Sequence, residues 1–142
     1  MTEKPTVFII GPTPPPFHGV AVAVQSLLQS CILEQFRVCH LDLADRRGIQ
    51  HVNKPDLHDV VLFLRQWLRL VSMLLRVRPT LTYLVLSQTT IGFFRDSFLI
   101  WPAYLRGSHI VIHLHGGNFR HWFLGRSWFM RAYVRAVLRR VM

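Results

Sequence analysis

Four short segments with strand patterns alternate with helix-compatible stretches, and this alternation constrains the fold of the chain more than any other feature. The predicted strands occupy residues 7–11, 36–43, 81–86 and 109–114. The helix-compatible stretches occupy residues 20–34, 57–77, 91–106 and 122–142. Alternating strands and helices favour a parallel sheet with right-handed crossovers. We therefore expect an α/β fold, with a Rossmann-like parallel sheet and helices on both of its faces.

The helix predicted over residues 57–77 has the clearest periodicity. Its apolar residues recur at steps of three and four, and its arginines fall on another flank, as in an amphipathic helix. The apolar positions are Leu57, Val61, Leu64, Leu68, Val71 and Leu75, and the arginines are Arg65, Arg69 and Arg76. Elsewhere, the polar residues 45–56 predict a loop, and Pro102 predicts a kink or an interruption in its helix.

Positive charge is concentrated in the second half of the chain. Residues 1–60 contain 5 Lys+Arg and 6 Asp+Glu, whereas residues 61–142 contain 12 and 1, which gives the net charge of +10. Such an excess of arginine suits phosphate groups, anionic lipid headgroups or nucleic acid. No recognition motif accompanies the isoelectric point of about 11.3, so we expect no nucleic-acid partner.

Length and composition predict one folded domain over residues 1–142. A hydrophobic fraction of 51% excludes a disordered chain. Cys31 and Cys39 have no metal-binding or disulfide spacing, which indicates free thiols in a reducing compartment. Arginines interrupt every long apolar run, and no signal peptide precedes the first strand. We expect a cytoplasmic protein that lies peripherally on the cytoplasmic face of the membrane.

The sequence ends within an arginine-rich amphipathic helix that has neither a cap nor a glycine stop. A fourth strand with nothing after its helix would also leave an unpaired sheet edge, which proteins usually pair or cover. We therefore expect the chain to be the first portion of a longer protein.

Two of the predicted strands end in glycine-bearing loops. Residues 7–11 lead into the loop PTPPPFHG of residues 12–19, and residues 109–114 lead into HGGN of residues 115–118. The carboxyl ends of parallel strands meet at one edge of a sheet, where ligands bind. Gly19 could bring backbone N–H groups and a helix start close to phosphate, or form a plain tight turn. His18 could donate to phosphate or cap the helix.

These segments together resemble the N-terminal domain of the retaining family-4 glycosyltransferases, which have the two-Rossmann GT-B architecture. The resemblance is carried by residues 7–11, the loop PPPFHG of residues 14–19, the pair Arg95 and Asp96, and HLHGGNF of residues 113–119. It covers roughly residues 5–125. Where the family often has two glycines in the first loop, this chain has His18 and Gly19.

The resemblance implies that this domain holds the acceptor of a sugar transfer. It also implies that a second domain, absent from residues 1–142, holds most of the nucleotide-sugar, which is a co-substrate, so that no cofactor is needed. His115 is the implied catalytic residue, a hydrogen-bond donor near the acceptor or the departing oxygen. Gly19 and His18 would contact the donor diphosphate. Residues expected at the acceptor are Gly116, Gly117, Asn118, Thr90 and Arg95.

Each of these residues also has a structural interpretation. His115 could bond a neighbouring backbone carbonyl, Asn118 and Thr90 could be loop or cap residues, and Arg95 could form a surface pair with Asp96. His109 and His113 lie on one face of the predicted strand that leads into His115, but no carboxylate or cysteine completes a set of ligands, so we predict no metal.

We therefore expect the acceptor-binding portion of a glycosyltransferase, which moves a sugar from a nucleotide-sugar to a lipid-linked or surface-polysaccharide acceptor. The partners are then the nucleotide-sugar, a glycan or lipid-linked acceptor, an anionic membrane surface and a C-terminal domain. The alternative is a non-catalytic basic module that binds an anionic membrane or a partner chain. These 142 residues alone are expected to be inactive in transfer.

Overall fold

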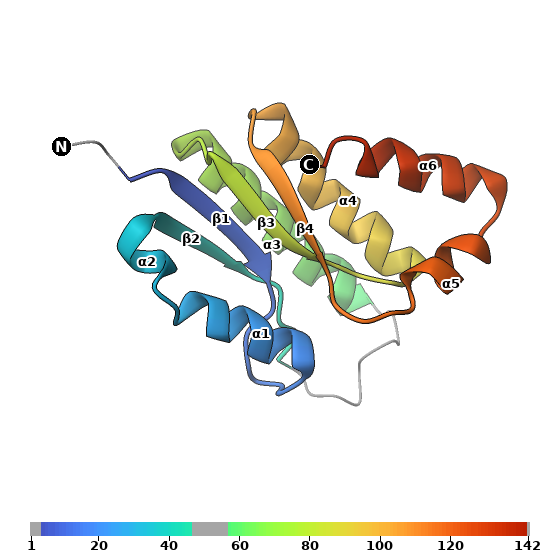
Figure 1. The fold of residues 1–142 in the computed structure, drawn as a ribbon, viewed down its shortest axis with the longest axis horizontal. Coiled ribbons are helices and arrows are strands. Elements are labelled where there is room, and N and C mark those ends of the chain that lie inside the picture. The colour runs from blue at the N-terminus through green and yellow to red at the C-terminus, as the bar shows by residue number, and fades with distance from the viewer. Residues whose placement is uncertain (1–3, 47–56, 142) are drawn as a thin grey trace.

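A four-stranded parallel sheet in the order β2-β1-β3-β4 forms the centre of the molecule (Figure 1). The computed structural model describes residues 4–46 and 57–141. The strands are β1 (Thr6–Gly11), β2 (Arg37–Asp42), β3 (Leu81–Leu86) and β4 (His109–Leu114). In the central pairs, Ile10 lies opposite Leu41 on one side and Leu84 on the other. The predicted α/β fold with a Rossmann-like parallel sheet is confirmed.

Helices cover both faces of this sheet, as predicted. On one face lie α1 (Gly19–Leu28) and α2 (Ile32–Gln35), which connect β1 to β2. On the other lie α3 (Leu57–Arg76) and α4 (Thr90–Leu105), with α5 (Phe119–Leu124) and α6 (Trp128–Leu138) beyond β4. The chain adds β2 on one side of β1 and β3 on the other, so the strand order reverses there. Such a reversal is where open α/β sheets bind their ligands.

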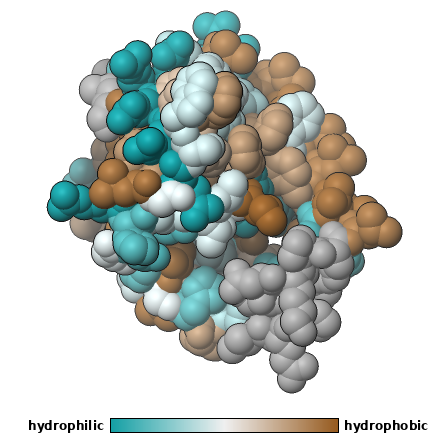
Figure 2. Space-filling model, turned by 90° about the vertical axis from the view of Figure 1, so that its right-hand side faces the viewer, coloured by the Kyte–Doolittle hydropathy of each residue, from teal (hydrophilic) through white to brown (hydrophobic). Residues whose placement is uncertain are grey.

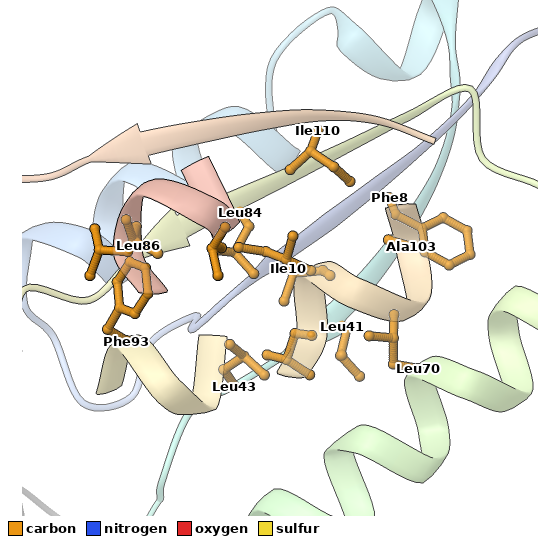
Figure 3. Packing of buried hydrophobic residues seen from close by; sticks show 14 of the residues in the cluster. Phe8, Ile10, Leu41, Leu43, Leu70, Leu84, Leu86, Phe93, Ala103 and Ile110 are labelled. Carbon is orange, nitrogen blue, oxygen red and sulfur yellow. The ribbon is translucent and has the colours of Figure 1, made fainter. Parts of the chain in front are cut away.

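The main core lies between the sheet and the layer formed by α3, α4 and α6. Phe8, Ile10 and Leu84 of the strands and Phe93 of α4 are at most 1% exposed there, and Figure 3 shows strand and helix side chains meeting in this core. Alternate residues of the same strands, including Ile9, form a smaller cluster under α1. Burial on both faces explains why β1 is an unbroken apolar run rather than an alternating one.

Two of the predicted helices are each divided in the structure. The helix expected over residues 20–34 ends at Leu28 and resumes at Ile32, and the helix expected over residues 122–142 is replaced by α5 and α6. In the second case the Ser127 side chain caps α6 by accepting a hydrogen bond from the Met130 N–H at 3.4 Å. Apolar periodicity continues across both breaks, so it could not predict where the helices end. Residues 47–56 of the predicted loop lie outside the described residues.

Pro102 does not interrupt α4, which runs continuously from Thr90 to Leu105. A proline lacks the N–H that would bond the carbonyl four residues earlier, here that of Phe98. The indole Nε1 of Trp67 on α3 donates to this carbonyl at 3.2 Å. A side chain of the neighbouring helix therefore satisfies the group that Pro102 leaves open, and the same contact ties α3 to α4.

Part of one sheet face stays open. On the side that carries α1, no helix among the described residues covers β4, and Val111 is 36% exposed. On this open face the Tyr83 hydroxyl and Nδ1 of His113 are 2.5 Å apart.

Within residues 4–46 and 57–141, no helix is long and apolar enough to cross a membrane.

Replacing the core residue Leu84 by Ala tests this packing. Leu84 is fully buried at the centre of β3, so its truncation should lower the free energy of unfolding by about 2–5 kcal/mol. Equilibrium unfolding in urea, followed by circular dichroism, measures the change. Leu33→Ala on α2, where the side chain is 53% exposed, should change the free energy by no more than about 0.5 kcal/mol. Equal losses in the two variants would contradict the described core.

Candidate functional site

A cleft of about 780 Å³ opens at the carboxyl ends of β1 and β3, between α1, α3 and α4. Its walls include His18, Thr90, Arg95 and His115, which come from three separate segments of the chain. Asp45 and Asp59 also line it. A volume of this size is typical of sites for small molecules. The cleft therefore lies where the reversal of strand order predicts a ligand.

The imidazole of His115 lies directly against the start of α1. A methyl group added at Gly19 would sit 2.8 Å from Nε2 of His115, closer than real side-chain contacts come. Only glycine allows the ring this position without a shift. The contact brings the loop after β1 and the loop after β4, which carry separate sequence motifs, next to each other.

His18 caps α1. Its backbone is extended, and its Nδ1 accepts a hydrogen bond from the Ala21 N–H at 3.4 Å. The structural interpretation of His18 as a cap is therefore observed. Because Nδ1 accepts that bond, Nε2 is the ring nitrogen left for a ligand in the cleft, which His18 also lines.

Arg95 is held in the cleft wall by a buried carboxylate. Asp96, whose side chain is 0% exposed, accepts from Nε and Nη2 of Arg95 at 2.9 and 2.7 Å and from the Ser87 N–H at 2.7 Å. The Arg95 Nη2 also donates to the Ser87 hydroxyl at 3.0 Å. Nη1 has no hydrogen-bond partner among the described residues. Arg95 is thus an oriented donor whose charge is largely balanced by Asp96.

Gln88 joins the end of β3 to the loop after β4. Its Nε2 donates to the carbonyls of His115 and Gly116 at 3.1 and 3.0 Å. Gly116 has φ = 109°, a backbone conformation that side-chain-bearing residues rarely adopt. The amide of Gln88 therefore fixes the backbone that positions His115.

The remaining predicted acceptor residues lie beside the cleft rather than in its wall. Gly117 and Asn118 are exposed, and a Cβ at Gly117 would meet no atom within 4 Å. Asn118 precedes α5 as its cap residue, but its side chain makes no capping hydrogen bond. Both residues are accessible to a ligand that extends out of the cleft along this loop.

A second cavity adjoins the cleft at Thr90. It has a volume of about 590 Å³ and lies between α4 and α6, with Phe94, Phe129 and Tyr133 in its wall. The guanidinium of Arg126 donates to the Thr90 hydroxyl at 3.3 Å at this junction. The polar cleft and this cavity, whose wall includes three aromatic side chains, therefore meet at Thr90.

Asp42, at the end of β2, holds the loop that follows β1. Its carboxylate accepts from the N–H and the hydroxyl of Thr13, both at 3.0 Å, and from the Ala44 N–H at 2.9 Å. Arg46 forms a salt bridge with it at 2.8 Å. Burial raises the pKa of Asp42, but the hydrogen bonds from Ala44, Thr13 and Arg46 outweigh it, so the pKa lies below its ordinary value.

A short series of aromatic rings runs from the open sheet face to the cleft. The Tyr83 hydroxyl bonds His113, and the His113 ring lies edge-on to the His115 ring, with 5.8 Å between centroids. Burial raises the pKa of Tyr83, so its hydroxyl stays protonated and can donate to His113. The described residues contain no group of three His, Cys, Asp or Glu side chains arranged to hold a metal ion.

The structure brings His18, Thr90, Arg95 and His115 into the cleft wall, with Gly19 against His115, but leaves Gly116, Gly117 and Asn118 outside the wall. Sequence reasoning missed three residues: Gln66, Gln88 and Gly92. Gln66 lines the cleft as a buried polar residue on the core-facing side of α3, and the apolar periodicity of this helix did not identify that side. Gln88 acts through carbonyls of a distant segment, for which the sequence contains no local signal, whereas Gly92 acts through its close approach to Ser87 and Thr89.

Gly92→Ala tests how closely α4 must approach the end of β3. The new Cβ would lie 2.5 Å from Cβ of Ser87 and 2.7 Å from the Thr89 hydroxyl, so the helix must shift. We expect a loss of about 1–3 kcal/mol in the free energy of unfolding, measured in urea. Gly117→Ala, with open space around it, is the matched control. A loss no larger than that of the control would contradict this packing.

The pKa of Asp42 predicts a dependence of stability on pH. Because its pKa is lower in the folded than in the unfolded state, Asp42 stabilises the fold fully above the ordinary aspartate pKa of about 3.9. This contribution is lost as the pH falls through the folded-state pKa. Asp42→Asn should therefore lower the melting temperature at neutral pH and reduce its fall at acid pH, as measured by circular dichroism. An unchanged acid profile would contradict the assignment. Glu34→Gln on α2 controls for loss of one exposed acidic residue.

The chain was also compared with models of protein families, with curated proteins and with solved structures, and none of them matched. The resemblance to family-4 glycosyltransferases over roughly residues 5–125 therefore stays a prediction from the sequence.

Proposed function

We propose that the chain is the acceptor-binding portion of a glycosyltransferase that uses a nucleotide-sugar donor. The observation that carries this proposal is the contact of His115 with Gly19 at the head of the cleft. It joins the two loops on which the family resemblance depends. Sugar transfer requires a donor phosphate and an acceptor hydroxyl at one place, and this cleft offers groups suited to both.

The residues of the cleft suggest a division of roles. The N–H groups at the start of α1, with His18, suit the diphosphate, because a helix N-terminus favours anions. Arg95 offers Nη1 to a phosphate or hydroxyl oxygen without bringing an unbalanced charge. A retaining transfer develops positive charge at the sugar and negative charge on the leaving diphosphate. His115 would donate a hydrogen bond near the acceptor or the departing oxygen.

The neighbouring cavity supports an acceptor with an apolar part. Its aromatic wall begins at Thr90, where the polar cleft ends. An acceptor whose sugar or phosphate occupies the cleft could place an apolar chain between α4 and α6. A lipid-linked acceptor fits this arrangement better than a wholly polar glycan does.

The second candidate function is a non-catalytic module that binds an anionic membrane or a partner chain. The observation in its favour is the strongly exposed apolar surface of α3, where Leu57 and Leu75 are 86% and 70% exposed. Binding through this surface does not require chemistry in the cleft.

Replacing His115 by Ala tests the transferase proposal. In the full gene product, incorporation of labelled sugar from a panel of nucleoside-diphosphate hexoses into the membrane lipid fraction should fall by roughly tenfold or more. The reason is the loss of the hydrogen bond to the reacting oxygen. Initial rates at saturating donor, in membranes with equal amounts of each variant, provide the measurement.

His121→Ala is the matched control, because this exposed histidine of α5 lies outside the cleft. An unchanged rate for His115→Ala would remove His115 from the mechanism. Absence of transfer from every donor, by the unaltered protein, would favour the binding module instead.

A further inference from the structure

The apolar stripe that makes residues 57–77 so recognisable as a helix faces away from the core. Leu64 and Leu68 are 52% and 53% exposed, and the stripe continues to both ends of α3. The residues of α3 that are buried, Gln66, Leu70 and Leu74, lie on the opposite side. The helix is therefore apolar on two sides, and only one of them packs against the core.

The outer side of α4 continues this apolar surface. Phe98 is 55% exposed and contacts Phe63 of α3, with 6.2 Å between the ring centroids. Ile91 and Leu105 are 68% and 76% exposed on the same helix. In Figure 2 apolar residues gather along the right-hand side, which is the side of α3 and α4. We call the outer sides of α3 and α4 the outer helix face.

Arginines border the outer helix face. At 3.6 residues per turn, Arg65, Arg69 and Arg76 lie about 100° around α3 from the leucine stripe. On the other border, the Arg140 guanidinium lies 5.7 Å from the centre of the Trp101 ring of α4. The cations are thus placed beside the apolar surface and not opposite to it.

Charge decides which partner this face fits. From residue 60 onward the sequence has one acidic residue, Asp96, and that carboxylate is buried against Arg95. A second copy of the chain would bring two surfaces of the same positive charge together, which is unfavourable. An anionic bilayer offers an apolar layer for the leucines and phosphates for arginines at its border.

We propose that the outer helix face docks the protein on an anionic membrane surface. In this arrangement α3 lies in the plane of the interface. Leu64, Leu68 and Phe98 enter the boundary between headgroups and acyl chains. Arg65, Arg69 and Arg76 reach lipid phosphates from the side. Docking does not depend on sugar transfer, so this proposal and the proposed function can fail separately.

Sedimentation of the purified chain with vesicles tests the proposal. Vesicles of phosphatidylcholine with phosphatidylglycerol should bind the chain at least tenfold more tightly than vesicles of phosphatidylcholine alone, roughly as a cluster of arginines predicts. The double variant Leu64→Gln/Leu68→Gln should lose roughly tenfold or more of the affinity for anionic vesicles. Both leucines are exposed, so the fold is retained, which circular dichroism checks.

Two matched controls separate the surface from general polarity and charge. Leu33→Gln on α2, with 53% exposure like Leu68 but on the other side of the sheet, should bind as the unaltered chain does. Arg65→Gln/Arg69→Gln should reduce the preference for anionic lipid, whereas Arg37→Gln/Arg120→Gln, which removes the same charge elsewhere, should reduce it less.

Three outcomes would overturn the proposal. The first is no binding to either kind of vesicle. The second is unaltered binding by Leu64→Gln/Leu68→Gln. The third is a dimer in light scattering that this double variant abolishes, because the face would then be occupied by a second copy.

Discussion

The buried carboxylate of Asp96 connects the end of β3 to the first turns of α4, and the geometry of the cleft depends on it. It accepts the Ser87 N–H and two donors of Arg95 in a site without solvent contact. An unpaired group there would carry a large desolvation cost, so the carboxylate and its donors hold one another in place. The absence of a side chain at Gly92 lets α4 come close enough for these bonds. Gln88 then extends the same fixed segment to the backbone of His115.

The order of strands and helices could be predicted because burial on both sheet faces leaves unbroken apolar runs, as in β1. The convergence of His18, Gly19, Thr90, Arg95 and His115 was also accessible, since strand carboxyl ends share one edge of a parallel sheet. Helix ends were less predictable: Ser127 begins a new helix through a local hydrogen bond that apolar periodicity does not reveal. Gln88 acts through carbonyls 27 and 28 residues away, which no local pattern encodes.

The two-sided character of α3 marks a limit of periodicity as evidence. The regular stripe of leucines identifies a helix but does not say which medium the stripe contacts. In the structure the core takes the less regular side, with Gln66, Leu70 and Leu74, and the regular stripe is exposed. Fold stability and surface chemistry are therefore encoded on different sides of one helix. Substitutions on the two sides should accordingly have separate effects.

The hydrogen bond from Trp67 to the Phe98 carbonyl joins α3 and α4 at the point where Pro102 opens the backbone. Since α4 starts at the cleft and its outer side belongs to the outer helix face, this helix pair links the cleft to that face. On a docked protein, an acceptor held in the same bilayer would reach the cleft by lateral diffusion in two dimensions. The effective concentration of the acceptor in the bilayer, rather than many tight contacts with it, would then set how often the cleft is occupied.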